Sequence, residues 1–213
     1  MKTLLGITVV LALGAGAGFL SSHRKTGRVQ GFHRVVGVDP GNVGKCELPS
    51  APGLAPGDRL VGFSSGCFWG SEEAFRRIPG IVATAVGYTG GSSQFPTYEV
   101  AHRTGHLETV LVEFNPKRTP FTDLLKVYWT LPRSTSDAPV PPTSSYKAAI
   151  WTYDQDEAKA AATSRDAVEK KLHHPTRVAI QPAQPFYMAE DYHQQYDEKA
   201  GKELCNTQHA PKR

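Results

Sequence analysis

The sequence predicts an α+β fold, a two-layer sandwich with a central mixed sheet, helices and long loops. Segments typical of strands alternate irregularly with helical patterns, so the regular repeat of a doubly wound sheet is missing. The 213 residues include 20 glycines and 16 prolines, which predict many turns and long connections. The chain has no internal repeat, and its length fits one domain with tails.

The expected elements of the first half follow residue 57. Residues 60–63 form a short apolar run typical of a buried strand, and residues 71–78 follow the helical period until Pro79 and Gly80 end it. Residues 81–86 predict a second strand, which a glycine-rich turn at 87–91 ends. After a long loop, apolar and polar residues alternate over 106–114 and predict a third strand.

The second half predicts two helices and two strands. A short helix is expected over 120–129, a proline- and serine-rich loop over 131–145, and a strand over 146–153. Asp154 is a typical N-cap for the amphipathic helix that follows through residue 172. A final strand over 176–181 and a short helix or turn over 192–196 complete the domain.

The N-terminal residues predict targeting and linker segments. Lys2 precedes an uncharged run over residues 3–20, so residues 1–22 resemble a signal peptide or membrane anchor. We therefore expect a secretory or membrane-anchored protein. A mitochondrial presequence is the alternative, because no acidic residue precedes Asp39 while several basic ones do. Residues 23–57 lack periodicity and predict a flexible linker, and residues 201–213 predict a mobile C-terminal tail.

Charge and cysteine content exclude several classes of protein. The net charge of +4 is modest and basic residues do not cluster beyond the first segment, so no nucleic-acid partner is expected. Three cysteines, Cys46, Cys67 and Cys205, are too few for a dense disulfide framework, and their spacing matches no zinc pattern. We expect no metal and no organic cofactor.

Cys67 is the strongest candidate for a reactive residue. It lies between an expected strand and an expected helix, where unpaired backbone N–H groups and the helix dipole favour a thiolate. Gly66 and Gly70 permit a tight turn and close approach of a substrate, and Phe68 and Trp69 indicate an apolar pocket beside the sulfur. A lone cysteine is more often a small buried hydrophobe, so the assignment needs partners elsewhere in the chain.

Four ordered motifs supply such partners. They are GCFWG at 66–70, GYTGG at 87–91, PTY at 96–98 and TGHLE at 104–108. Together they resemble the A-type peptide methionine sulfoxide reductase family. The resemblance extends more thinly from residue 58 to residue 196, where AEDYHQQY at 189–196 is also similar to the family. It implies that residues 58–200 form a methionine sulfoxide reductase catalytic domain.

The resemblance implies reduction of the S epimer of methionine sulfoxide, free or within oxidised proteins. Cys67 would attack the sulfoxide sulfur, and Glu108 would protonate the departing oxygen, because a carboxyl beside aromatics can stay protonated. Tyr98 and Tyr146 would donate hydrogen bonds to that oxygen. Phe68 and Trp69 would bind the substrate methyl group. The other interpretation of Glu108 is a solvated glutamate at a strand end.

The resemblance also implies how the enzyme is reset. The Cys67 sulfenic acid would condense with a second thiol, for which Cys205 is the preferred candidate and Cys46 the alternative. A thioredoxin-like dithiol protein would then reduce the disulfide. We expect a monomer. The chain departs from the family at Pro141, where many relatives carry an acidic residue, and this departure makes the substrate preference and the role of Tyr146 less firm.

Two other functions are open from the residues alone. Cys67 could be the nucleophile of a cysteine hydrolase with His106 or His193 as its base. It could also be a structural residue of a secreted binding module. Sulfoxide reduction accounts better for an acidic partner such as Glu108.

Overall fold

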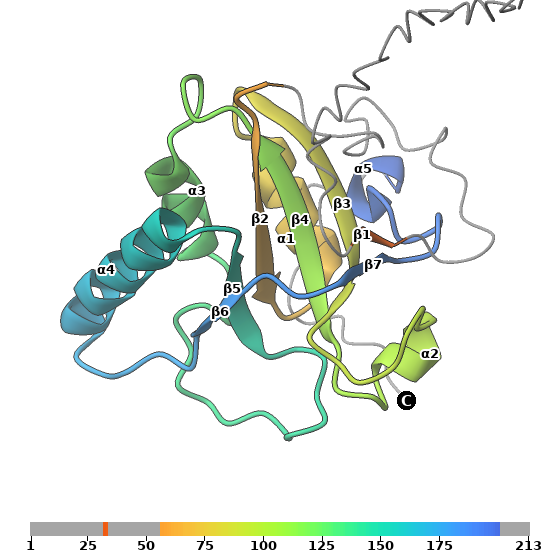
Figure 1. Cartoon of the computed structure of the whole chain (residues 1–213). Coiled ribbons are helices and arrows are strands. Elements are labelled where there is room, and N and C mark those ends of the chain that lie inside the picture. Colours follow the sequence, from red (N-terminus) through yellow and green to blue (C-terminus); the bar gives the residue numbers. More distant parts are fainter. Residues whose placement is uncertain (1–31, 34–55, 201–213) are drawn as a thin grey trace, which may run out of the picture.

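A seven-stranded mixed sheet forms the centre of the protein (Figure 1). The computed structural model describes the backbone of residues 32–33 and the whole of residues 56–200. The order of the strands is β1-β7-β3-β4-β2-β5-β6. Neighbouring strands are antiparallel except for the two outer pairs, β1 with β7 and β5 with β6, which are parallel. The predicted α+β class with a mixed sheet is confirmed.

The bounds of the elements follow the chain in order. The strands are β1 (Phe32–His33), β2 (Arg59–Ser65), β3 (Ile81–Thr89), β4 (Leu107–Phe114), β5 (Ala148–Thr152), β6 (Ala179–Pro182) and β7 (Phe186–Met188). The helices are α1 (Phe68–Arg76), α2 (Tyr98–Ala101), α3 (Phe121–Tyr128), α4 (Gln155–Leu172) and α5 (Tyr196–Lys199). Within the described part of the chain, no helix is long and apolar enough to cross a membrane.

The main hydrophobic core lies between one face of the sheet and helices α1, α3 and α4. Phe63 of β2 shows this arrangement, because its ring stacks on Phe75 of α1 at a centroid distance of 4.5 Å and also faces Phe121 and Tyr128 around α3. Ala161 of α4 belongs to the same core. Because α1 packs on β3 and β4, its N-terminus is fixed against the centre of the sheet.

Three short elements, α2, β7 and β1, escaped the sequence prediction. Helix α2 has four residues, which is too short to show a helical period. Strand β7 has three residues between Pro185 and the turn that follows, yet it pairs with β3 along residues 87–89. Strand β1 falls within the residues expected to form a linker and pairs with β7. The segment 191–195 forms a turn, and α5 begins after it.

The prediction that residue 146 begins a strand is wrong. The Tyr146 backbone N–H donates to Ser144 Oγ at 3.1 Å, within a local turn, and β5 begins only at Ala148. Tyr146 therefore lies in the approach to the strand rather than in its hydrogen-bonded ladder. The last strand also starts later than expected, at Ala179 instead of residue 176.

Candidate active site

Cys67 lies in the tight connection between β2 and α1. Gly66 supplies the turn with a φ of +87°, a left-handed value that favours glycine. Cys67 follows as the half-buried N-cap of α1. The first N–H groups of a helix have no partner within the helix, and its dipole is positive at this end. The backbone therefore stabilises an anionic sulfur at this position.

Glu108 is buried directly beside this helix start. It is the second residue of β4, its side chain is only 2% exposed, and its Oε2 accepts a hydrogen bond from the backbone N–H of Phe68 at 3.1 Å. Burial raises the pKa of Glu108, while the neighbouring His102 and the hydrogen bond from Phe68 act in the opposite direction. Glu108 is therefore no solvated strand-end residue, and its proton is retained at higher pH than that of an ordinary glutamate.

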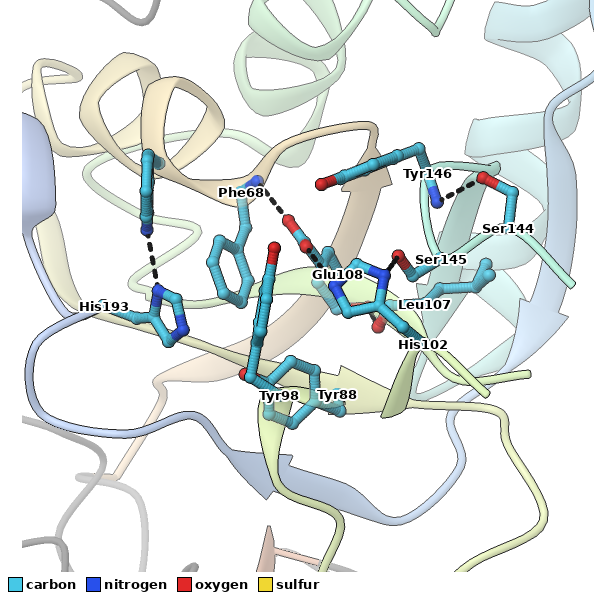
Figure 2. A network of polar contacts seen from close by, with 12 residues as sticks. Phe68, Tyr88, Tyr98, His102, Leu107, Glu108, Ser144, Ser145, Tyr146 and His193 are labelled. Carbon is cyan, nitrogen blue, oxygen red and sulfur yellow. Dashed lines mark hydrogen bonds and ion pairs between the residues drawn. The ribbon is translucent and has the colours of Figure 1, made fainter. Parts of the chain in front are cut away.

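The hydroxyl groups of Tyr98 and Tyr146 reach toward the Glu108 carboxyl from opposite sides (Figure 2). Tyr98 comes from the start of α2, and Tyr146 from the loop before β5. The two hydroxyls are close enough for each to affect the pKa of the other. Burial raises the pKa of both tyrosines, and the nearby Cys67 and Glu108 add to that rise. Both phenols therefore stay protonated and able to donate.

Aromatic side chains form a wall next to the sulfur. Phe68 is buried and packs against His193 at 5.1 Å, whereas Trp69 is half-buried and stacks on Tyr196 at 3.7 Å. The Trp69 indole donates to His193 Nδ1 at 3.0 Å. Burial lowers the pKa of His193 to about 4, so the imidazole is neutral and accepts this bond. The wall can bind an apolar group.

Three further residues, His102, Ser145 and Glu190, belong to the site and were missed in the sequence analysis. The His102 imidazole lies between Glu108 and Ser145 (Figure 2). Glu190 accepts from the Tyr98 backbone N–H through Oε1 and from the Tyr88 hydroxyl through Oε2, both at 2.9 Å. The spacing of Tyr98 and His102, four residues apart, was the available signal, because this spacing places two side chains on one face of a helical turn.

The remaining predicted residues either fall outside the described part of the chain or make other contacts. Cys46 and Cys205 fall outside the described residues, as does the expected targeting segment. His106 contacts Thr104 at 3.0 Å and packs edge-on against Tyr187. Within residues 56–200, no group of histidine, cysteine, aspartate and glutamate side chains could hold a metal ion.

The fold and this site define a thiol-dependent enzyme in which a cysteine at a helix start faces a buried carboxylic acid. Residues 59–213 match the model of the family described as peptide methionine sulfoxide reductase. The reductase MsrA of Methanosarcina acetivorans is 44% identical over 154 residues, which cover 68% of this chain and 82% of that protein. Its counterpart from Methanosarcina mazei is 46% identical, over 68% and 73% of the two chains.

Solved structures agree. Methionine sulfoxide reductase A of Corynebacterium diphtheriae superposes with a TM-score of 0.63 at 31% identity, over 72% of this chain and 82% of that chain. Reduced Mxr1 from Saccharomyces cerevisiae also gives a TM-score of 0.63, at 26% identity, over 70% and 88% of the two chains. The chain therefore belongs to the peptide methionine sulfoxide reductase family, as an A-type member, and is a peptide-methionine (S)-S-oxide reductase. A reductase is favoured over a cysteine hydrolase or a binding module.

Proposed function

We propose that the protein reduces the S epimer of methionine sulfoxide, free or in oxidised proteins, through a sulfenic acid on Cys67. The observation that carries this proposal is the buried Glu108, whose Oε2 accepts from the N–H of the residue that follows the cysteine. This hydrogen bond supports the proposal, because it joins a carboxyl whose pKa burial raises to a helix start that favours a thiolate, the combination that sulfoxide reduction needs.

The reducing step conserves atoms and electrons. The Cys67 thiolate attacks the sulfoxide sulfur and forms an S–S bond, while the S–O bond breaks and the oxygen leaves as hydroxide with the proton from Glu108. Hydroxide then attacks the Cys67 sulfur, the S–S bond breaks, and its electron pair leaves with methionine. The products are methionine and a Cys67 sulfenic acid, and Glu108 is left as a carboxylate. Tyr98 and Tyr146 donate hydrogen bonds to the oxygen while its negative charge develops. Phe68 and Trp69 bind the methyl group through apolar contact.

The sulfenic acid then condenses with a second thiol to give a disulfide and water. Cys205 is our candidate for this thiol and Cys46 the alternative, and a thioredoxin-like dithiol protein supplies the two electrons that restore both cysteines. The cycle thus uses only the cysteine thiols of the enzyme and the external dithiol as redox groups.

The proposal is tested with both diastereomers of a methionine sulfoxide peptide and the reduced protein, by measuring methionine formed per enzyme. We expect the S epimer to be reduced and the R epimer to be left unchanged. Glu108→Gln should lower the single-turnover rate by about 100-fold or more, because general acid catalysis typically contributes factors of this size. Cys67→Ser should form no methionine.

Glu113→Gln is the matched control. Glu113 lies on the same strand, is also buried, and its pKa is raised to about 7 by burial and by Asp58, but it pairs with Leu60 at the opposite end of β2 from Cys67. Its substitution should leave the rate within about twofold. Equal loss in both variants, or full activity of Glu108→Gln, would contradict the role of Glu108.

The resolving thiol is tested separately. Cys205→Ser should form one equivalent of methionine and then stop when thioredoxin is the reductant. Cys46→Ser should continue to turn over. The opposite result would assign resolution to Cys46.

A further inference from the structure

His102 closes a ring of contacts around the acid of the site. Its Nδ1 lies 2.7 Å from Ser145 Oγ, and its Nε2 lies 3.3 Å from Glu108 Oε1. The ring is completed by the Glu108 backbone N–H, which donates to the Ser145 carbonyl at 3.0 Å. The Nε2 contact has the geometry of an ion pair more than of a linear hydrogen bond, because no acceptor lies in line with the N–H.

The two oxygens of Glu108 therefore have different surroundings. Oε2 accepts from the Phe68 backbone, an interaction that only the acceptor side of the carboxyl can make. Oε1 faces His102 and is the oxygen that can carry the proton. The imidazole is held edge-on against Tyr98 at 4.4 Å and against Tyr146 at 5.7 Å, so its position is fixed relative to both phenols.

Exposure distinguishes the two members of the pair. The Glu108 side chain is 2% exposed and the His102 side chain is 26% exposed. The acid is thus covered on this side by an imidazole whose Nε2 is itself buried, while other atoms of that side chain are exposed.

We propose that His102, anchored by Ser145, is a positioning residue that holds Glu108 Oε1. This proposal rests on the reductase function given above. The Ser145 hydroxyl suits both states of Nδ1, because it donates to a bare nitrogen and accepts from an N–H.

Other titratable groups also face the pair. They are Cys67 from the start of α1, Tyr88 from β3, Tyr98 from α2, Tyr146 from the loop before β5, and His193 from the turn before α5. Burial keeps the three phenols protonated and His193 neutral.

The test compares His102→Asn with His102→Gln. The asparagine amide approximates Nδ1 and keeps the contact with Ser145, whereas the glutamine amide approximates Nε2 and keeps a donor to Glu108. We expect the single-turnover rate to fall about tenfold in His102→Asn and less in His102→Gln. The alkaline limb of the pH–rate profile should move to higher pH in His102→Asn, and less in His102→Gln, because His102 lowers the pKa of Glu108.

His173→Asn is the control. This exposed histidine ends α4 in a left-handed conformation that asparagine accepts, and its substitution should change neither the rate nor the limb. A purely structural role of His102 would lower the rate at every pH without moving the limb. An unshifted limb, or a rate within about twofold of the unsubstituted protein, would overturn the proposal.

A second readout needs no substrate. The ¹³C resonance of the Glu108 carboxyl, followed against pH, should report a higher pKa in His102→Asn and in Ser145→Ala than in the unsubstituted protein. Identical titration curves would refute the proposal even if the reductase activity is as expected. Conversely, a shifted curve in a protein that reduces no sulfoxide would support the pairing and refute the function.

Discussion

Replacement of Glu72 by glutamine should remove a pH dependence from the stability of the fold. Glu72 is the fifth residue of α1 and is fully buried. Its Oε1 accepts from Thr84 Oγ1 at 2.9 Å, and its Oε2 accepts from the Gln195 backbone N–H at 2.6 Å. Burial raises its pKa from 4.5 to about 7 even though both hydrogen bonds lower it. The folded protein therefore holds this proton more tightly than the unfolded chain.

The sign and size of the effect follow from these two values. The stability that the proton contributes is fully present below pH 4.5 and is lost as the pH rises toward 7, because the unfolded chain ionises first. At 1.36 kcal/mol per pKa unit, a difference of about 2.5 units gives about 3 kcal/mol. Glutamine can present its oxygen to Gln195 and its amide to Thr84 Oγ1, so it imitates the protonated acid at every pH.

The assay is urea unfolding of both proteins between pH 4.5 and pH 8.5. The difference in the free energy of unfolding should grow in favour of Glu72→Gln as the pH rises, by about 3 kcal/mol in total. The prediction concerns the difference between the two proteins, because other groups also make the stability of the fold depend on pH. Glu113 has a similar pKa, and the stability that His193 contributes, with its pKa lowered to about 4, increases over nearly the same pH range. A constant difference would refute the argument that Glu72 is protonated in the fold.

Three further substitutions test the packing around the site by chemical unfolding. Gly87→Ala should destabilise the fold by about 1–3 kcal/mol, because its Cβ would lie 2.3 Å from the Tyr187 carbonyl oxygen and force β3 and β7 apart. Trp69→Phe should cost about 1–3 kcal/mol and raise KM, since the buried His193 Nδ1 loses its donor. Leu124→Ala should cost about 2–5 kcal/mol through a cavity in the core, without a change in KM. Unchanged unfolding midpoints would contradict the corresponding contact in each case.

The long periodic elements were predictable from the sequence for local reasons. The α4 helix shows its N-cap and its period over eighteen residues, and Asp154 does accept from the Glu157 N–H as an N-cap should. Strand β4 was recognised by its pattern, with nearly the same bounds. Strand β7 was not predictable, because three residues after Pro185 contain no period, and its pairing with β3 depends on the remainder of the sheet.

The residues of the candidate site were also predictable only in part. Cys67 and Glu108 stand in short sequence motifs, so the chain itself identifies them. His102 and Ser145 carry no motif, and they belong to the site only because the fold brings residues 43 positions apart into contact. Glu190 likewise contacts Tyr98 across 92 positions. Contacts of this kind depend on sheet register, which the sequence does not express locally.

Residues 193–195, near the end of the described chain, contact α1 and β3. Trp69 meets His193 across 124 positions, Glu72 meets Gln195 across 123, and Val86 meets Gln194 across 108. These contacts form only after residue 195 has been synthesised, so a polypeptide that ends before residue 193 lacks all three of them and leaves the buried carboxyl of Glu72 without its backbone donor.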